Sequence, residues 1–137
     1  MVRIRFRRMG AKKQPSYRIV VTDQRKARDS KYIEVIGNHN PRTEPTTDIL
    51  DEARALYWLS VGAQPSESVR RLMQRTGTWG RYERLTKGED MDVLVAEALA
   101  AQEAAEPVSP KTRFPAPPAG QGRKAKLAAA EAETAAE

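Results

Sequence analysis

The chain has 137 residues, a length that suits one domain, and it contains no cysteine, which excludes disulfides and thiolate metal sites. No apolar run approaches the roughly 20 residues needed to cross a bilayer, so we predict a cytoplasmic protein without membrane association. The charge is unevenly distributed: residues 1–88 hold nineteen basic and nine acidic side chains, whereas residues 89–137 hold five and nine.

The first predicted element is a strand over residues 2–7, in which apolar and basic side chains alternate with a period of two. The apolar residues share one face, and Arg3, Arg5 and Arg7 share the other. Alternate side chains of a strand lie about 6.6 Å apart, a spacing close to that of phosphates along a nucleic-acid strand. Together with Arg8, these residues predict a row of fixed cations that contacts phosphates.

Two basic loops and two further strands follow this first strand. Gly10 and Pro15 interrupt the alternation around Lys12 and Lys13, which indicates a basic hairpin loop. Residues 16–23 are predicted as the second strand, residues 24–30 as a second basic loop, and residues 31–36 as a third strand that stops at Gly37. We expect the two basic loops to flank one groove.

The next part of the chain predicts a short edge strand and two helices. Residues 38–47 have the composition of turns and loops, and residues 48–50 form the edge strand. A helix follows Asp51 over residues 52–59, and a second runs from Ser66 to about Thr76, with Gly62 and Gly77 after them. The two helices should pack on the apolar face of the sheet and leave the arginine face outside.

These elements predict an α+β fold: a small two-layer domain of three to four mainly antiparallel strands with two helices on one face. We assign the RNA-binding domain to residues 1–82. Residues 83–137 are predicted to be a largely disordered Ala/Pro-rich tail, because apolar side chains are too few there to offset the entropy of ordering the chain. A weak apolar stripe indicates one helix in this tail, over residues 92–105.

Twelve side chains are predicted to bind RNA. Eleven of them are the Lys and Arg residues of the first 31 positions, which face only two acids. The twelve are Arg3, Arg5, Arg7, Arg8, Lys12, Lys13, Tyr17, Arg18, Arg25, Lys26, Arg28 and Lys31. Tyr17 and Tyr32 suit stacking or hydroxyl contacts with RNA, although a tyrosine at strand spacing more often belongs to the core.

No catalytic residue, metal site, cofactor or small-molecule substrate is predicted. His39, the single histidine, lacks the nucleophile and orienting partner that a general base needs, and we interpret it as a hydrogen-bonding turn residue. Trp58 and Trp79 are predicted to close the helical side of the core, with anchoring of a partner as the alternative for Trp79.

The residues from Ile4 to Asp23, with the order Arg-x-Gly-x-Lys-Lys-x-Pro-x-Tyr inside them, resemble the family of bacterial small-subunit ribosomal protein sixteen. Residues 33–41 and 58–66 match the same family, so the resemblance covers roughly residues 1–80. It implies a structural component of the small ribosomal subunit that binds the 5′ domain of the ribosomal RNA. It also implies contacts with neighbouring small-subunit proteins and a role in assembly.

Two other functions remain open from the residues themselves. A metal-dependent nuclease would share the basic face but would need clustered carboxylates to hold cations near the scissile phosphate, and the nine acids of residues 1–88 are widely spaced. A protein adaptor would use the Ala/Pro-rich tail to recruit a partner.

Overall fold

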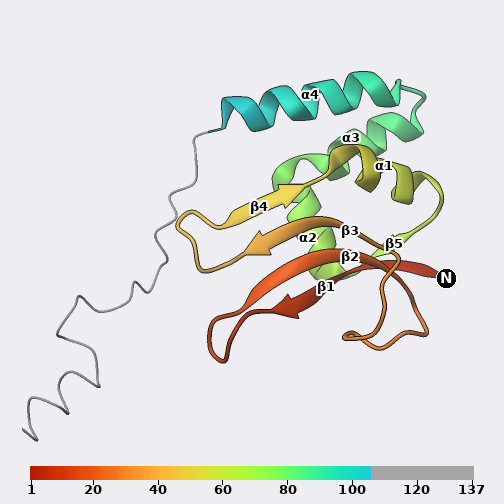
Figure 1. Cartoon of the computed structure of the whole chain (residues 1–137). Helices are drawn as coiled ribbons and strands as arrows, with labels where there is room; N and C mark the ends of the chain where they lie inside the picture. The colour runs from red at the N-terminus through yellow and green to blue at the C-terminus, as the bar shows by residue number, and fades with distance from the viewer. Residues whose placement is uncertain (106–137) are drawn as a thin grey trace, which may run out of the picture.

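The structure of the protein is a computed structural model that describes residues 1–105, and it contains one five-stranded sheet and four helices (Figure 1). The sheet order is β4-β3-β2-β1-β5, and every pairing is antiparallel except that of β1 with β5. The strands are β1 (Val2–Met9), β2 (Ser16–Asp23), β3 (Glu34–Asn40), β4 (Thr47–Leu50) and β5 (Gln64–Pro65). The helices are α1 (Glu52–Ser60), α2 (Glu67–Thr76), α3 (Thr78–Thr86) and α4 (Met91–Ala104). The predicted α+β class with a mainly antiparallel sheet is confirmed.

The hydrophobic core lies between one face of the sheet and the helices. Ile4, Ile19 and Val21 project from β1 and β2 into this core and are fully buried, as their alternation predicts. The helices meet them with apolar side chains at helical spacing, of which Leu59, Val69, Leu72 and Met73 are buried. Trp58 and Trp79 pack at the margin of the same cluster. Both tryptophans therefore close the helical side of the core, as predicted.

The third strand is displaced from its predicted position. It spans Glu34–Asn40 rather than residues 31–36, and it continues through Gly37 instead of stopping there. A Cβ atom on Gly37 would lie only 2.4 Å from the carbonyl oxygen of Ile49 in β4, so the β4 backbone leaves no room for a side chain at this position. Gly37 therefore allows β3 and β4 to pack closely and does not end the strand.

One helix, α3, is added to those predicted. Gly77 ends α2 in a left-handed conformation (φ 83°), as predicted, but α3 begins at the next residue and includes Trp79. The predicted domain boundary between residues 82 and 83 falls inside α3. The helix predicted at residues 92–105 is present as α4, where Leu94 and Ala98 are buried against α1 and α3. The predicted disorder further along the tail lies outside the described residues.

Candidate nucleic-acid interface

The predicted arginine row lies on the face of the sheet that points away from the helices. In the register of β1 with β2, Arg3 is opposite Thr22, Arg5 opposite Val20, and Arg7 opposite Arg18. Because cross-strand partners project to the same side, Arg3, Arg5, Arg7 and Arg18 share one face. The alternating row is placed as predicted, but Arg8, opposite Tyr17, lies on the other face and does not belong to it.

That face is partly covered by the loop between β2 and β3, residues 24–33, which we call the basic loop. The basic loop folds back across the outer surface of β1 and β2 (Figure 1). Arg5 donates to backbone carbonyls of Asp23, Gln24 and Lys26 at 3.3, 3.1 and 3.3 Å, and Arg7 donates to that of Asp29 at 3.4 Å. The arginine face lies outside as predicted, but two of its guanidinium groups bind the protein's own backbone.

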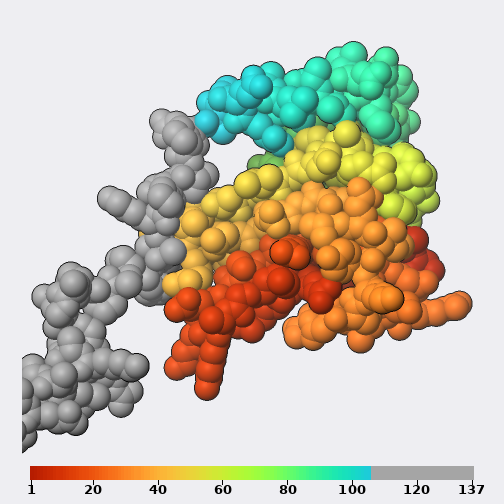
Figure 2. Space-filling view, viewed as in Figure 1, coloured from red at the N-terminus to blue at the C-terminus, as the bar shows by residue number. Residues whose placement is uncertain are grey.

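The two basic loops lie at opposite ends of β1 and β2. The hairpin turn, residues 10–15, projects at the lower left of Figure 2, and the basic loop occupies the lower right. Successive connections of an antiparallel sheet leave from opposite ends of the strand they share, so the two loops cannot meet as the walls of one groove. The expectation of a shared groove is wrong. A hollow lies instead between β1 and the basic loop, lined by Arg7, Asp29, Ser30, Lys31 and Tyr32.

The cations of this region differ from those of the helical part in their lack of carboxylate partners. Among residues 1–105, Arg28 is the single predicted RNA-binding cation in an ion pair, with Asp29 at 3.3 Å. Most arginines of the helical part are paired, namely Arg54 with Glu34, Arg71 with Glu67, Arg75 with Asp48, Arg81 with Glu52, and Arg84 with Glu89 and Glu97. Uncompensated positive charge therefore gathers on β1, β2 and their loops.

The two candidate tyrosines have different surroundings. Tyr17 lies on the helix side of the sheet, half-buried, with its ring 5.6 Å from that of Phe6 and 6.0 Å from that of His39. Tyr32 lies in the basic loop with 36% of its surface exposed, and the guanidinium carbon of Arg7 is 5.1 Å from its ring centre. Tyr32 is therefore the more accessible of the two aromatic rings.

His39 lies within β3, not in a turn, and its Nδ1 contacts the carboxylate of Asp48 in β4. The same carboxylate accepts hydrogen bonds from Arg75 at 2.8 and 2.6 Å. The predicted hydrogen-bonding role is confirmed, and the predicted turn is wrong, because Asn38 and His39 continue the ladder between β2 and β4. Within residues 1–105 no group of three or more His, Cys, Asp or Glu side chains is placed to hold a metal ion.

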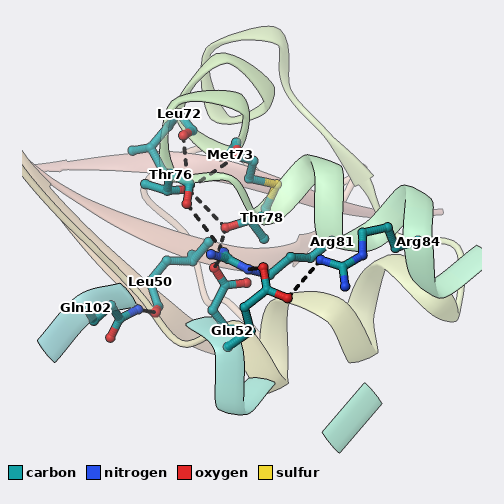
Figure 3. A network of polar contacts seen from close by, with 10 residues as sticks. Leu50, Glu52, Leu72, Met73, Thr76, Thr78, Arg81, Arg84 and Gln102 are labelled. Carbon is teal, nitrogen blue, oxygen red and sulfur yellow. Dashed lines mark hydrogen bonds and ion pairs between the residues drawn. The ribbon is translucent and has the colours of Figure 1, made fainter. Parts of the chain in front are cut away.

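A buried polar network, which sequence reasoning missed, fixes the helices that support the sheet (Figure 3). Glu52 at the start of α1 accepts from the Thr78 hydroxyl and from Arg81 of α3, both at 2.7 Å. Burial raises the pKa of Glu52, although the contacts with Thr78 and Arg81 oppose that shift. On α4, Gln102 donates to the Leu50 carbonyl at 3.2 Å.

A small sheet with unpaired cations on its outer side is typical of a basic protein that contacts nucleic acid. The sequence model of the family described as Ribosomal protein S16 matches residues 8–66. The chain is 49% identical over 82 residues to the small ribosomal subunit protein bS16 of Dictyoglomus turgidum, covering 60% of this chain and 88% of the relative.

Two further relatives carry the same name. Identity is 51% over 85 residues with the bS16 protein of Syntrophomonas wolfei (62% of this chain, 97% of the relative). The chain is 56% identical over 77 residues to the bS16 protein of Roseiflexus sp., covering 56% of this chain and 81% of the relative. The chain belongs to the ribosomal protein S16 family of the small subunit and is a structural constituent of the ribosome, not an enzyme.

Helix α4 lies beyond the residues matched by the family's sequence model. Within residues 1–105, no helix combines the length and the hydrophobicity that crossing a membrane requires.

Proposed function

We propose that this protein binds the RNA of the small ribosomal subunit, in its 5′ domain, and supports assembly of the subunit. The observation that carries this proposal is the set of cations without carboxylate partners on β1, β2 and their two loops. A protein that only needed these charges for its own stability would pair them, as the helical part does. Cations held apart from carboxylates are available to phosphates.

The mechanism is electrostatic. RNA helices that approach one another repel through their phosphates, and a rigid cationic surface between them lowers that repulsion and releases condensed counterions. The exposed Lys12, Lys13 and Arg18 serve this role on and beside the hairpin turn. The exposed Arg25, Lys26, Arg28 and Lys31 serve it on the basic loop, Arg28 from an exposed ion pair with Asp29. Contacts of this kind position the RNA and do not select its sequence.

The salt dependence of RNA binding tests the proposal. If about six phosphates are neutralised, the logarithm of the binding constant should fall with the logarithm of salt concentration with a slope of order −5. Lys12→Ala should weaken binding to every fragment of the 5′ domain by a similar factor. Arg71→Ala is the matched control, because this exposed arginine of α2 is paired with Glu67 and should leave binding unchanged. A slope near zero would contradict the mechanism.

The assembly role and contacts with neighbouring small-subunit proteins need a second measurement. Small subunits reconstituted with the wild-type protein should sediment as compact particles at low salt. A variant with Lys12, Lys13, Arg25 and Lys26 changed to alanine should yield slower particles. If particles that contain the variant sediment as the wild-type particles do, these cations are not needed for assembly, and the proposed assembly role is wrong.

A further inference from the structure

Arg5 makes more contacts with the protein's own backbone than any other cation of the predicted row. One terminal nitrogen of its guanidinium donates to the carbonyls of Asp23 and Gln24, and the other donates to that of Lys26. Its Nε atom is buried and has no partner among the described residues. The guanidinium is therefore directed at the start of the basic loop, and both of its terminal nitrogens donate there.

Apart from Arg5, the basic loop is held to the first strand by weaker or terminal contacts: Arg7 donates to the Asp29 carbonyl at 3.4 Å, and the Gln24 amide donates to the Met1 carbonyl at 2.9 Å. Residues 24–29 are all exposed, so no apolar side chain of this stretch anchors it in the core. Its internal contacts are short-range turns, such as the Lys26 amide to the Asp23 carbonyl (3.1 Å) and the Arg25 amide to the Asp23 carboxylate (2.8 Å). Four cations within eight residues also repel one another. The hydrogen bonds from Arg5 of β1 to three loop carbonyls offset both the missing apolar anchor and the charge repulsion.

We propose that Arg5 is a positioning residue, which holds the basic loop in the shape that presents Arg25, Lys26, Arg28 and Lys31 together to RNA. This inference rests on the proposed function. It reassigns Arg5, whose place in the alternating row suggested a direct phosphate contact. In this proposal, RNA phosphates contact the cations of the basic loop. Arg5 contributes indirectly, by holding the backbone that carries those cations.

Replacing Arg5 by lysine separates the two roles, because the charge is kept and the geometry is lost. An ammonium is a compact point charge that cannot span three carbonyls as a planar guanidinium does. If Arg5 contacted a phosphate, Arg5→Lys would leave the salt slope unchanged, and Arg5→Ala would reduce it by about 0.9. For a positioning residue, both variants should weaken binding at least tenfold and reduce the slope by more than one unit, since several loop cations lose contact together.

Arg71→Lys is the matched control, since Arg71 is exposed on α2, is paired with Glu67 and lies outside the predicted RNA-binding set. We expect its affinity to stay within twofold of wild type. Asp23→Ala supplies an independent variant, because it removes the acceptor for the Arg25 amide while making the protein more positive. If the shape of the basic loop controls binding, Asp23→Ala should bind RNA more weakly than wild type in spite of its added positive charge. Tighter binding would contradict the positioning role of Arg5.

Hydrogen exchange of the free protein tests the loop without RNA. In Arg5→Lys, the amides of residues 25–31 should exchange at least tenfold faster than in wild type, whereas those of Ile19 and Val21 in β2 should stay protected and report an intact fold. Unchanged loop exchange together with wild-type RNA affinity would overturn the inference. Faster loop exchange in a protein whose wild type shows no salt-dependent RNA binding would keep Arg5 as the anchor and reject the proposed function.

Discussion

Individual arginines of this protein have three different environments, although the sequence makes them look equivalent. Arg5 bridges backbone carbonyls, Arg81 is buried beside a carboxylate, and Arg18 is exposed without an ion-pair partner among the described residues. Charge counting located the basic region correctly, because net charge depends on composition alone. It could not assign roles within that region, because these depend on where the basic loop folds.

The buried pair of Glu52 and Arg81 predicts a pH-dependent loss of stability when Arg81 is removed. Burial raises the pKa of Glu52 above the value of 4.5 for a free side chain, so its contribution to stability is complete below that pH and is lost as the pH rises through the folded pKa. Arg81→Ala leaves the carboxylate unpaired and should cost about 3 kcal/mol at about pH 7. Urea unfolding should show a smaller loss near pH 4.5, and a loss independent of pH would contradict this account.

Glu34 should show the opposite pH dependence. Hydrogen bonds from Arg54, and secondarily from Trp58, hold the pKa of the Glu34 carboxyl below its ordinary 4.5. Its stabilising effect is therefore present above pH 4.5 and disappears as the pH falls through the folded pKa. Glu34→Gln should melt at a lower temperature than wild type at about pH 7. The two melting curves should converge in acid, and a constant difference would rule out this explanation.

Gly37 is a position where the packing of β3 against β4 leaves no room for a side chain. Gly37→Ala places a Cβ atom 2.4 Å from a backbone oxygen and 3.2 Å from the Leu50 Cα, so the strands must shift. We expect a loss of about 1–3 kcal/mol in the free energy of unfolding. Gly80→Ala in α3 is the control, because its Cβ would meet nothing within 4 Å. Its helix should gain about 0.5–1 kcal/mol.

The local signals of the sequence identified β1, β2, α1 and α2 because each has a clear period and a clear end. Asp51 caps α1 through the Arg54 amide, and Gly77 ends α2, both as predicted. Helix α3 was missed because it follows a terminating glycine without any linker. Its position is set by Thr78 and Arg81 bonding to Glu52, 26 and 29 residues earlier in the chain. Contacts at that separation leave no periodic pattern in a sequence.

For the whole molecule, the structure separates the cationic surface from the acidic α4, which contains three acids and no base. Truncation after Gly88 removes α4 and exposes the apolar surface that Leu94 covers. The free energy of unfolding should fall by about 2 kcal/mol. Truncation after Ala105 keeps all of α4 and is the comparison. Both truncated proteins should keep the salt slope of RNA binding. A reduced slope after either truncation would place part of the RNA contact in the C-terminal region.

Gln102 also covers one backbone group at the β4 edge of the sheet. An exposed outer strand is a template on which another chain can add and begin aggregation. On one margin of this sheet the Leu50 carbonyl is already occupied by Gln102, and on the other β5 is two residues long and includes Pro65, which has no amide hydrogen to offer. Edge-to-edge pairing of two copies should therefore be disfavoured at β5 and at the Leu50 end of β4.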